Sequence, residues 1–260
     1  MLFDSHCHLD LAPLGADLPA VLDRAAQAGV SQILIPGVCQ EKWKDVAASC
    51  QVSHAITRYV ALGLHPCFLE CHKDQTDLDA LESGLQKSDD VLAVGECGLD
   101  LFIDNPQEER QKALFKAQLD LALKYKRPVI IHSRRSLDQV IKILRYTRPD
   151  RGGVLHAFSG SEQQAKQLWD LGIRLGIGGA VTYERAQRLA RVVKAMPLTS
   201  LLLETDAPDM PLCGFQGTAN EPAQIVRVAQ AVASLRNQSL HEIALQTTAN
   251  AQSLFLQRST

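Results

Sequence analysis

The sequence lacks an excess of charge of either sign. Its 27 Lys and Arg residues nearly balance its 29 Asp and Glu residues, for a formal net charge of −2. Coating nucleic acid or an anionic membrane through bulk electrostatics needs a clear cationic excess, so that mode is excluded while a local basic patch is still allowed. The chain also lacks apolar runs near the ~18–20 residues that span a bilayer. We therefore expect no membrane association.

A disulfide framework and a cationic leader are missing as well. The seven cysteines are an odd number without regular spacing, which in a chain of 260 residues favours reduced thiols. The first Lys or Arg is Arg24, so the basic start of a secretory signal is absent. Both observations predict a cytoplasmic protein. Nothing in the sequence points to a protein partner.

Short apolar runs alternate with amphipathic segments from one end to the other. No linker, low-complexity tract or charge block interrupts them, which predicts a single domain over residues 1–260. Helical patterns include Leu18–Ala28, Pro106–Lys126, Pro222–Leu235 and Leu240–Leu256. The expected strands are Met1–Ser5, Ser31–Pro36, Tyr59–Leu64, Val91–Gly95, Val129–His132, Gly153–His156, Ile173–Gly178 and Leu201–Glu204.

A strand followed by a helix, repeated eight times, is typical of an α/β fold of the (β/α)₈ TIM-barrel kind. The strands are apolar throughout, as expected where parallel strands are covered on both faces. An open doubly wound sheet has the same periodicity. The two folds differ in where strand ends meet, because these ends converge on one face of a barrel but lie along a line in an open sheet.

Residue types that bind metals recur at the carboxyl ends of the expected strands. A lone His at such a place is more often a packed or hydrogen-bonded residue than a ligand. The recurrence at so many strand ends favours one shared site, and therefore the closed barrel. The residues concerned are His6, His8, His65, Glu96, His132, His156 and Asp206.

The pair His6 and His8 is the most specific part of this pattern. Alternation along an extended segment puts both imidazoles on one side, while Cys7 points the other way into packing. Imidazole and carboxylate ligands suit Zn, Mg or Mn, and leave the identity of the ion open. The ligands outnumber what one catalytic ion uses, so we expect two divalent ions with Glu96 as a shared ligand. Cys67, Cys71 and His72 lack the spacing of a zinc knuckle.

Ordered motifs along the whole chain resemble the TatD-type metal-dependent deoxyribonucleases of the amidohydrolase-like superfamily, and among them the YjjV-like branch. These motifs are Asp4-Ser5-His6-Cys7-His8-Leu9-Asp10, Gly63-Leu64-His65-Pro66, Gly95-Glu96-Cys97-Gly98-Leu99-Asp100, Ile131-His132-Ser133-Arg134, Leu155-His156-Ala157-Phe158-Ser159-Gly160 and Glu204-Thr205-Asp206-Ala207-Pro208. The resemblance implies a divalent-metal phosphodiesterase. It also implies two ligand sets, the first being His6, His8, Glu96 and Asp206 and the second Glu96, His132 and His156.

The same resemblance and the strand-end positions suggest roles for further residues. Asp206 is expected to accept the proton of the attacking water, and His65 to contact the substrate phosphate or protonate the leaving oxygen. Arg134 and Arg135 follow His132 directly and are expected to hold a phosphate. An arginine that many relatives carry near Asn220 is absent here.

The leading hypothesis is a deoxyribonuclease acting on single-stranded or frayed nucleic acid ends. Strand-end residues lie at the floor of a cup walled by loops, which a duplex about 20 Å across should not enter. RNA ends fit the same cup. Hydrolysis of an amide, lactone or ester is the alternative, since the same barrel and metal chemistry serves those reactions. A non-catalytic metal-binding scaffold is a third interpretation, against which the complete ligand set speaks.

Overall fold

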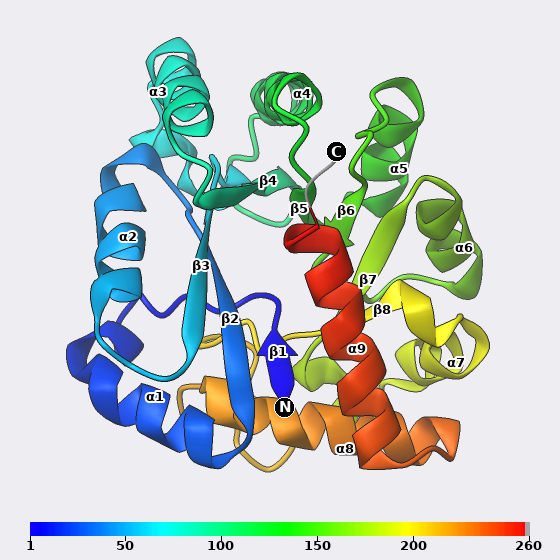
Figure 1. Cartoon of the computed structure of the whole chain (residues 1–260). Coiled ribbons are helices and arrows are strands. Elements are labelled where there is room, and N and C mark those ends of the chain that lie inside the picture. The colour runs from blue at the N-terminus through cyan, green and yellow to red at the C-terminus, as the bar shows by residue number, and fades with distance from the viewer. Residues whose placement is uncertain (258–260) are drawn as a thin grey trace.

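The computed structural model describes residues 1–257 and shows eight parallel strands in one sheet, hydrogen-bonded in the order of the sequence. Figure 1 shows the helices arranged around this sheet. The fold is a TIM-type (β/α)₈ barrel, as predicted. The strands are β1 (Leu2–Asp4), β2 (Val30–Pro36), β3 (Thr57–Leu62), β4 (Val91–Asp100), β5 (Val129–Arg134), β6 (Gly153–Leu155), β7 (Ile173–Ile177) and β8 (Leu201–Leu203).

Nine α-helices follow the strands within the described residues. They are α1 (Leu18–Gln27), α2 (Trp43–Gln51), α3 (Asp74–Lys87), α4 (Glu108–Lys124), α5 (Leu137–Tyr146), α6 (Glu162–Asp170), α7 (Gln187–Ala195), α8 (Ile225–Arg236) and α9 (Leu240–Phe255). Short 3₁₀ helices lie at Leu14–Asp17, Gln40–Lys42, Pro66–Cys71, Gly179–Thr182, Leu198–Ser200 and Pro222–Gln224. None of the helices in residues 1–257 is both long and apolar enough to cross a membrane.

The segments that follow β1 and β8 lie side by side and close the ring at the carboxyl ends of the strands. The Ser5 amide donates to the Leu203 carbonyl at 3.0 Å, and the Asp206 amide donates to the His6 carbonyl at 2.9 Å. A further bridge pairs Cys7 with Ala207. The first and last metal-ligand candidates are therefore neighbours although they are far apart in the sequence.

Strand β4 is longer than the sequence predicts. It continues to Asp100 instead of ending at Gly95, so Glu96 lies within the strand and not beyond it. The pairing with β5 shifts between Val94 and Cys97, which is the mark of a β-bulge. Gly98, at φ 143°, then passes so close to β5 that a Cβ there would lie 2.1 Å from the His132 carbonyl oxygen. Only glycine allows this approach, which brings Glu96 and His132 to one place.

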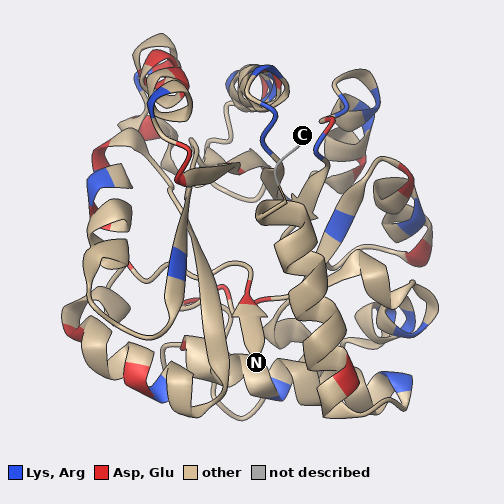
Figure 2. Cartoon of the chain, viewed as in Figure 1, with Lys and Arg blue, Asp and Glu red and all other residues tan. Residues whose placement is uncertain are grey.

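The opposite end of the barrel is closed by α9. Side chains from the strands, among them Phe3, Leu34 and Ile130, pack there against Leu254 and Phe255 in one buried cluster. Figure 1 shows α9 lying across this end, beside the N-terminus. The site must therefore open at the other end, where the strands finish. Lys, Arg, Asp and Glu are interspersed on the outer helices in Figure 2, in keeping with the balanced charge.

Candidate metal centre

His6 and His8 follow β1 and converge as the His-x-His spacing predicts. Their Nε2 atoms lie 3.2 Å apart, and Cys7 between them is fully buried in the core on the other side. Asp4 holds this segment against the end of β8, because its carboxylate accepts hydrogen bonds from the Thr205 hydroxyl at 2.6 Å and the Thr205 amide at 3.0 Å. The two imidazoles are thereby fixed beside the residues that follow β8.

One carboxylate oxygen of Glu96 faces this histidine pair. Glu96 Oε2 lies 3.0 Å from His6 Nε2 and 3.6 Å from His8 Nε2. Asp206 completes the group, with its Oδ1 at 3.4 Å from His6 Nε2 and 3.8 Å from His8 Nε2. Four residues thus direct potential ligand atoms into one small volume.

The other carboxylate oxygen of Glu96 faces a second set of imidazoles. Glu96 Oε1 lies 2.9 Å from His132 Nδ1, 2.8 Å from His156 Nε2 and 2.9 Å from His65 Nε2. His132 Nδ1 and His156 Nε2 are themselves 3.0 Å apart. The structure therefore gathers every metal-ligand candidate of the sequence, and Glu96 stands between two groups of them.

These residues fit a cation, because lone pairs face one another across the site. Asp100 Oδ2 lies 2.9 Å from His132 Nε2 and fixes the ring proton there, which leaves a lone pair on His132 Nδ1. That lone pair points at Glu96 Oε1 and His156 Nε2. Lone pairs that face one another at such distances need a proton or a cation between them. Imidazole nitrogens and carboxylate oxygens are suitable ligands for hydrolytic divalent ions.

The surroundings set the charge of these groups. Burial lowers the pKa of His6 to about 3 and that of His65 to about 4, so both rings are neutral. Burial alone would raise the pKa of Glu96, but the neighbouring imidazoles hold it well below its usual range. Burial also raises the pKa of Asp206. His6 and His65 are thus neutral and Glu96 is ionised. Asp206 binds a proton more readily than an ordinary aspartate does.

Burial lowers the pKa of an imidazole, but neighbouring carboxylates raise the pKa of His8 and His132, and the rise is large for His156. Burial alone would lower its pKa, but the Glu96, Asp206 and Glu204 carboxylates together raise it to about 10. Without a cation at the site, this imidazole carries the positive charge that balances the acidic groups. A divalent ion would replace that proton, because its own charge is the largest in such a site.

Two buried carboxylates that support the histidines were not assigned a role from the sequence. Asp100 orients His132, and Glu204 lies 3.9 Å from His156 Nδ1 while accepting the Ala157 amide at 2.5 Å. A Cβ on Gly176 would lie 2.1 Å from Glu204 Oε2. Gly176, within β7, therefore makes room for a supporting carboxylate. The only signals in the sequence were the Gly-Leu-Asp and Glu-Thr-Asp motifs.

His65 lies in the cluster but presents a different face to it. Its Nδ1 accepts the Cys67 amide at 3.0 Å, so in the neutral ring the proton sits on Nε2, which points at Glu96 Oε1. An N–H group donates a hydrogen bond and does not ligate a metal. His72 supports this loop by bonding to the His65 carbonyl, and the Cys67 thiol donates to Asp100 Oδ2 at 3.2 Å. Cys67 and His72 thus make hydrogen bonds that support this loop.

Arg134 and Arg135 lie at the mouth of the site, stacked on an exposed aromatic ring. Their guanidinium carbons are 3.9 Å and 4.1 Å from the centroid of the Phe102 ring, which is 44% exposed. The Phe102 amide donates to Asp100 Oδ1 at 2.8 Å. Asp100 therefore orients His132 and also positions the loop that carries Phe102.

A salt bridge holds the loop near Asn220. The Asn220 side chain is buried and donates to the Thr205 carbonyl at 2.8 Å. Glu221, the next residue, accepts two hydrogen bonds from Arg24 of α1, at 2.7 Å and 3.1 Å. The Arg24 guanidinium is therefore paired at this loop.

Comparison with known proteins gives full-length matches. The family model for TatD related DNase matches residues 3–256. The uncharacterized metal-dependent hydrolase YjjV of Escherichia coli K12 is 47% identical over 253 residues, covering 97% of this chain and 96% of its own. The uncharacterized metal-dependent hydrolase YabD of Bacillus subtilis is 35% identical, covering 98% and 99%.

Solved structures agree with these matches. The crystal structure of the YjjV TatD homolog from Escherichia coli superimposes with a TM-score of 0.94 at 46% identity, covering 99% of this chain and 98% of that one. A hydrolase of the TatD family from Entamoeba histolytica gives a TM-score of 0.83 at 25% identity, covering 98% and 97%.

Proposed function

The chain belongs to the family of TatD-related DNases and is a metal-dependent hydrolase, and from this premise we propose that it hydrolyses phosphodiester bonds at single-stranded or frayed DNA ends. The observation that carries the proposal is the position of Glu96, whose two oxygens each face a separate group of donors. A carboxylate placed in this way suits two neighbouring ions. RNA ends have the same phosphodiester chemistry and are tested beside DNA.

In this proposal the ligand roles follow the two groups around Glu96. His6, His8 and Asp206 would hold an ion on the Oε2 side, and His132 and His156 an ion on the Oε1 side. When bound, such ions polarise a phosphoryl oxygen and lower the pKa of a water. Asp206 has 13% of its side chain exposed, against 2% for Glu96, so it borders the open mouth. With its raised pKa it is the residue suited to take the proton of the attacking water.

Removal of the metal is the first test of the proposal. We expect a chelator to abolish hydrolysis of a single-stranded oligonucleotide, and Mg, Mn or Zn added one at a time to restore it for at least one ion. Metal analysis of the purified protein should find up to two divalent ions per chain. Activity that persists without any bound ion would contradict the metal roles.

The depth of the cluster predicts the choice of strand. His8, His65 and His156 are each less than a tenth exposed, so the reacting phosphate has to descend into the mouth. A frayed or single-stranded end can do so, whereas a duplex about 20 Å across cannot. We expect the initial rate on a single-stranded oligonucleotide to exceed that on its blunt duplex at the same salt. Faster cleavage of the duplex would refute this, and turnover confined to lactones, amides or esters would favour the carbonyl alternative.

His65 is proposed to bind substrate as a hydrogen-bond donor. Its Nε2–H lies 2.9 Å from Glu96 Oε1, and it would be available to a phosphoryl oxygen when that carboxylate oxygen holds an ion, since the other ring nitrogen accepts the Cys67 amide. For His65→Ala we expect a loss of about 10²–10³-fold in kcat, as for the removal of one donor that stabilises developing charge. Bound metal, measured by elemental analysis, should equal that of the wild type. Loss of an ion would make His65 a ligand instead.

Arg134 and Arg135 are proposed to hold the phosphate at the mouth. Stacking on Phe102 uses the flat faces of the guanidinium groups and leaves their N–H edges free to bind an oxyanion. The ring thereby fixes two flexible side chains before substrate arrives. It also means that a base would have to displace a guanidinium in order to stack on Phe102.

Loss of the Phe102 ring should therefore weaken binding more than chemistry. For Phe102→Leu we expect KM for an oligonucleotide to rise about 3- to 10-fold while kcat changes little, because the arginines lose their support but the metal ligands do not. Tyr146→Leu is the matched control, since Tyr146 is an exposed aromatic residue on the outer helix α5. An unchanged KM in Phe102→Leu would separate the ring from substrate binding.

A further inference from the structure

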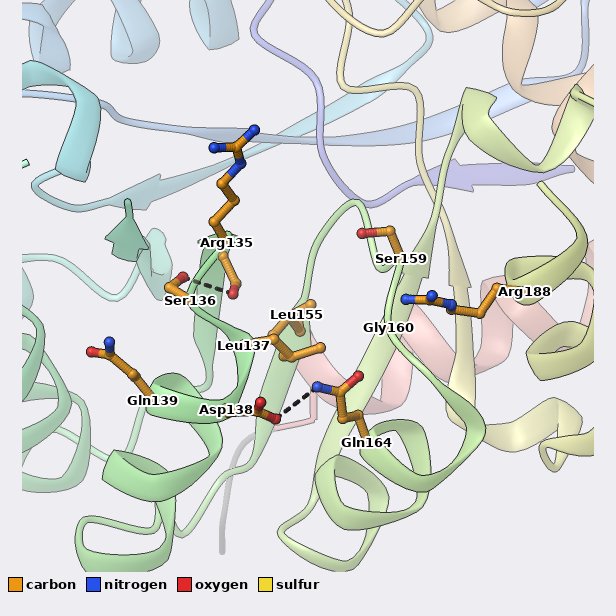
Figure 3. A pocket seen from close by; sticks show the side chains of 11 residues that line it. Arg135, Ser136, Leu137, Asp138, Gln139, Leu155, Ser159, Gly160, Gln164 and Arg188 are labelled. Atoms are coloured by element: carbon orange, nitrogen blue, oxygen red, sulfur yellow. Dashed lines mark hydrogen bonds between the residues drawn. The ribbon is translucent and has the colours of Figure 1, made fainter. Parts of the chain in front are cut away.

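A groove lies at the rim of the barrel, between the loops that follow β5 and β6. Its volume is about 420 Å³. Ser133 follows His132 in the sequence, and Leu155 precedes His156, so two residues of the lining are bonded to candidate metal ligands. Figure 3 shows the groove bordered on one side by the start of α5 and on the other by Ser159, Gly160 and Gln164. Side chains alternate along a strand, so the groove lies on the outer side of the rim that a nucleic acid strand leaving the site would cross.

The lining of the groove is polar and carries arginines at both ends. Arg135 belongs to the phosphate-holding pair described above, and Arg188 reaches in from α7 toward Ser159 and Gly160 (Figure 3). Within residues 1–257 the Arg188 guanidinium takes part in no ion pair. Asp138, a carboxylate in the lining, is occupied by the Gln164 amide at 2.7 Å. An unpaired guanidinium at the far end of a polar groove leaves its donors available to an anion.

We propose that this groove is a second phosphate subsite, which binds the internucleotide phosphate next to the one that is cut. The inference rests on the proposed phosphodiesterase function and adds that the length of the substrate affects how tightly it binds. A polar groove with basic residues that leads away from a reactive centre is the usual way to follow a single strand, because the sugar-phosphate backbone repeats one negative charge per nucleotide. Arg188 would bind that phosphate, and the serine hydroxyls of Ser133 and Ser159 would line its path.

The consequence is a preference for strands with more than one internucleotide phosphate. Phosphorothioate-linked oligothymidylates of two, three and four nucleotides resist cleavage, so their affinity for the metal-loaded protein can be measured by fluorescence anisotropy. We expect the step from two to three nucleotides to lower Kd about 5- to 10-fold, as for one added charge-assisted contact. The fourth nucleotide should add less.

Arg188→Gln should remove most of this gain. It should also lower the salt dependence of binding, with the slope of log K against log salt falling by about 0.7 for the lost contact to a single strand. Arg191→Gln is the matched control, because Arg191 lies on the same helix, is exposed and faces Glu162 instead of the groove. The control should bind like the wild type.

The outcomes separate this inference from the function on which it rests. A wild-type protein that cleaves no phosphodiester refutes the proposed function and the subsite with it. Cleavage of oligonucleotides without a gain from the second phosphate, or with the same gain in Arg188→Gln, refutes the subsite alone. Inorganic phosphate that binds as tightly as the added nucleotide, and depends on Arg188, would assign the groove to a free anion instead.

Discussion

Replacing Glu96 by Ala is expected to remove phosphodiester hydrolysis and to lower the metal content of the whole site. Its two oxygens lie within 3.0 Å of His6 Nε2 on one side and of His132 Nδ1 and His156 Nε2 on the other, so one substitution removes a ligand from both groups. Replacing a residue that only hydrogen-bonds to a metal ligand typically lowers metal affinity or activity 10–100-fold. A shared ligand should cost more, and we expect at least about 10³-fold in kcat.

The experiment compares rate and metal content in the same preparations. Glu82→Ala is the control, because Glu82 is a carboxylate on the outer helix α3, paired with Lys124 and Tyr125. Circular dichroism and thermal unfolding show whether Glu96→Ala still folds, and Glu96→Gln keeps the size of the side chain. Wild-type metal content and rate in a folded variant would show that Glu96 does not bridge.

Asp206→Asn is expected to have the second largest effect, with a different signature. Asp206 lies nearest the Oε2 group, at 3.4 Å from His6 Nε2, so about half of the metal should be lost and the Oε1 side should keep its ion. The rate should still fall by at least about 10³-fold, because a ligand and the proposed proton acceptor disappear together.

The control for Asp206 lies close by in the sequence. Asp209 is an exposed carboxylate on the same loop whose charge helps to raise the pKa of Asp206, so Asp209→Asn removes a neighbouring charge but no proposed ligand. It should retain both ions and most of the activity. If Asp206→Asn kept its full metal content and turned over normally, Asp206 would be neither a ligand nor the proton acceptor.

The barrel and the positions of the ligand candidates could be predicted because both depend on local patterns. Apolar runs indicated the strands, and the His-x-His spacing was enough to predict that His6 and His8 lie on one side of the chain. The end of β4 was predicted too early because Gly95 and Gly98 are typical of a turn. In the folded chain Gly98 instead allows β4 to press against the His132 carbonyl, a contact between strands that no single segment announces.

Supporting contacts were harder to predict because each joins segments that are distant in the sequence. The Glu204 side chain occupies the space that a side chain at Gly176 would fill. This contact cannot be predicted from either residue alone. The stacking of Arg134 and Arg135 on Phe102 likewise depends on the paths of two different loops. The arginines could be proposed from their place after His132, whereas their preorganisation could not.

The packing of α9 against one end of the barrel has a consequence for the order in which the chain folds. The strand side chains that it covers begin at Phe3, while Leu254 and Phe255 are synthesised more than two hundred residues later. Domains emerge from the ribosome with their N-terminal part first. The floor of the barrel must therefore stay open to water until almost the whole chain has been made. Contacts between segments so far apart also slow folding, since a long loop has to close before they form. A nascent chain that stops before α9 would expose the buried cluster, which makes the last helix the step that commits the barrel to its native state.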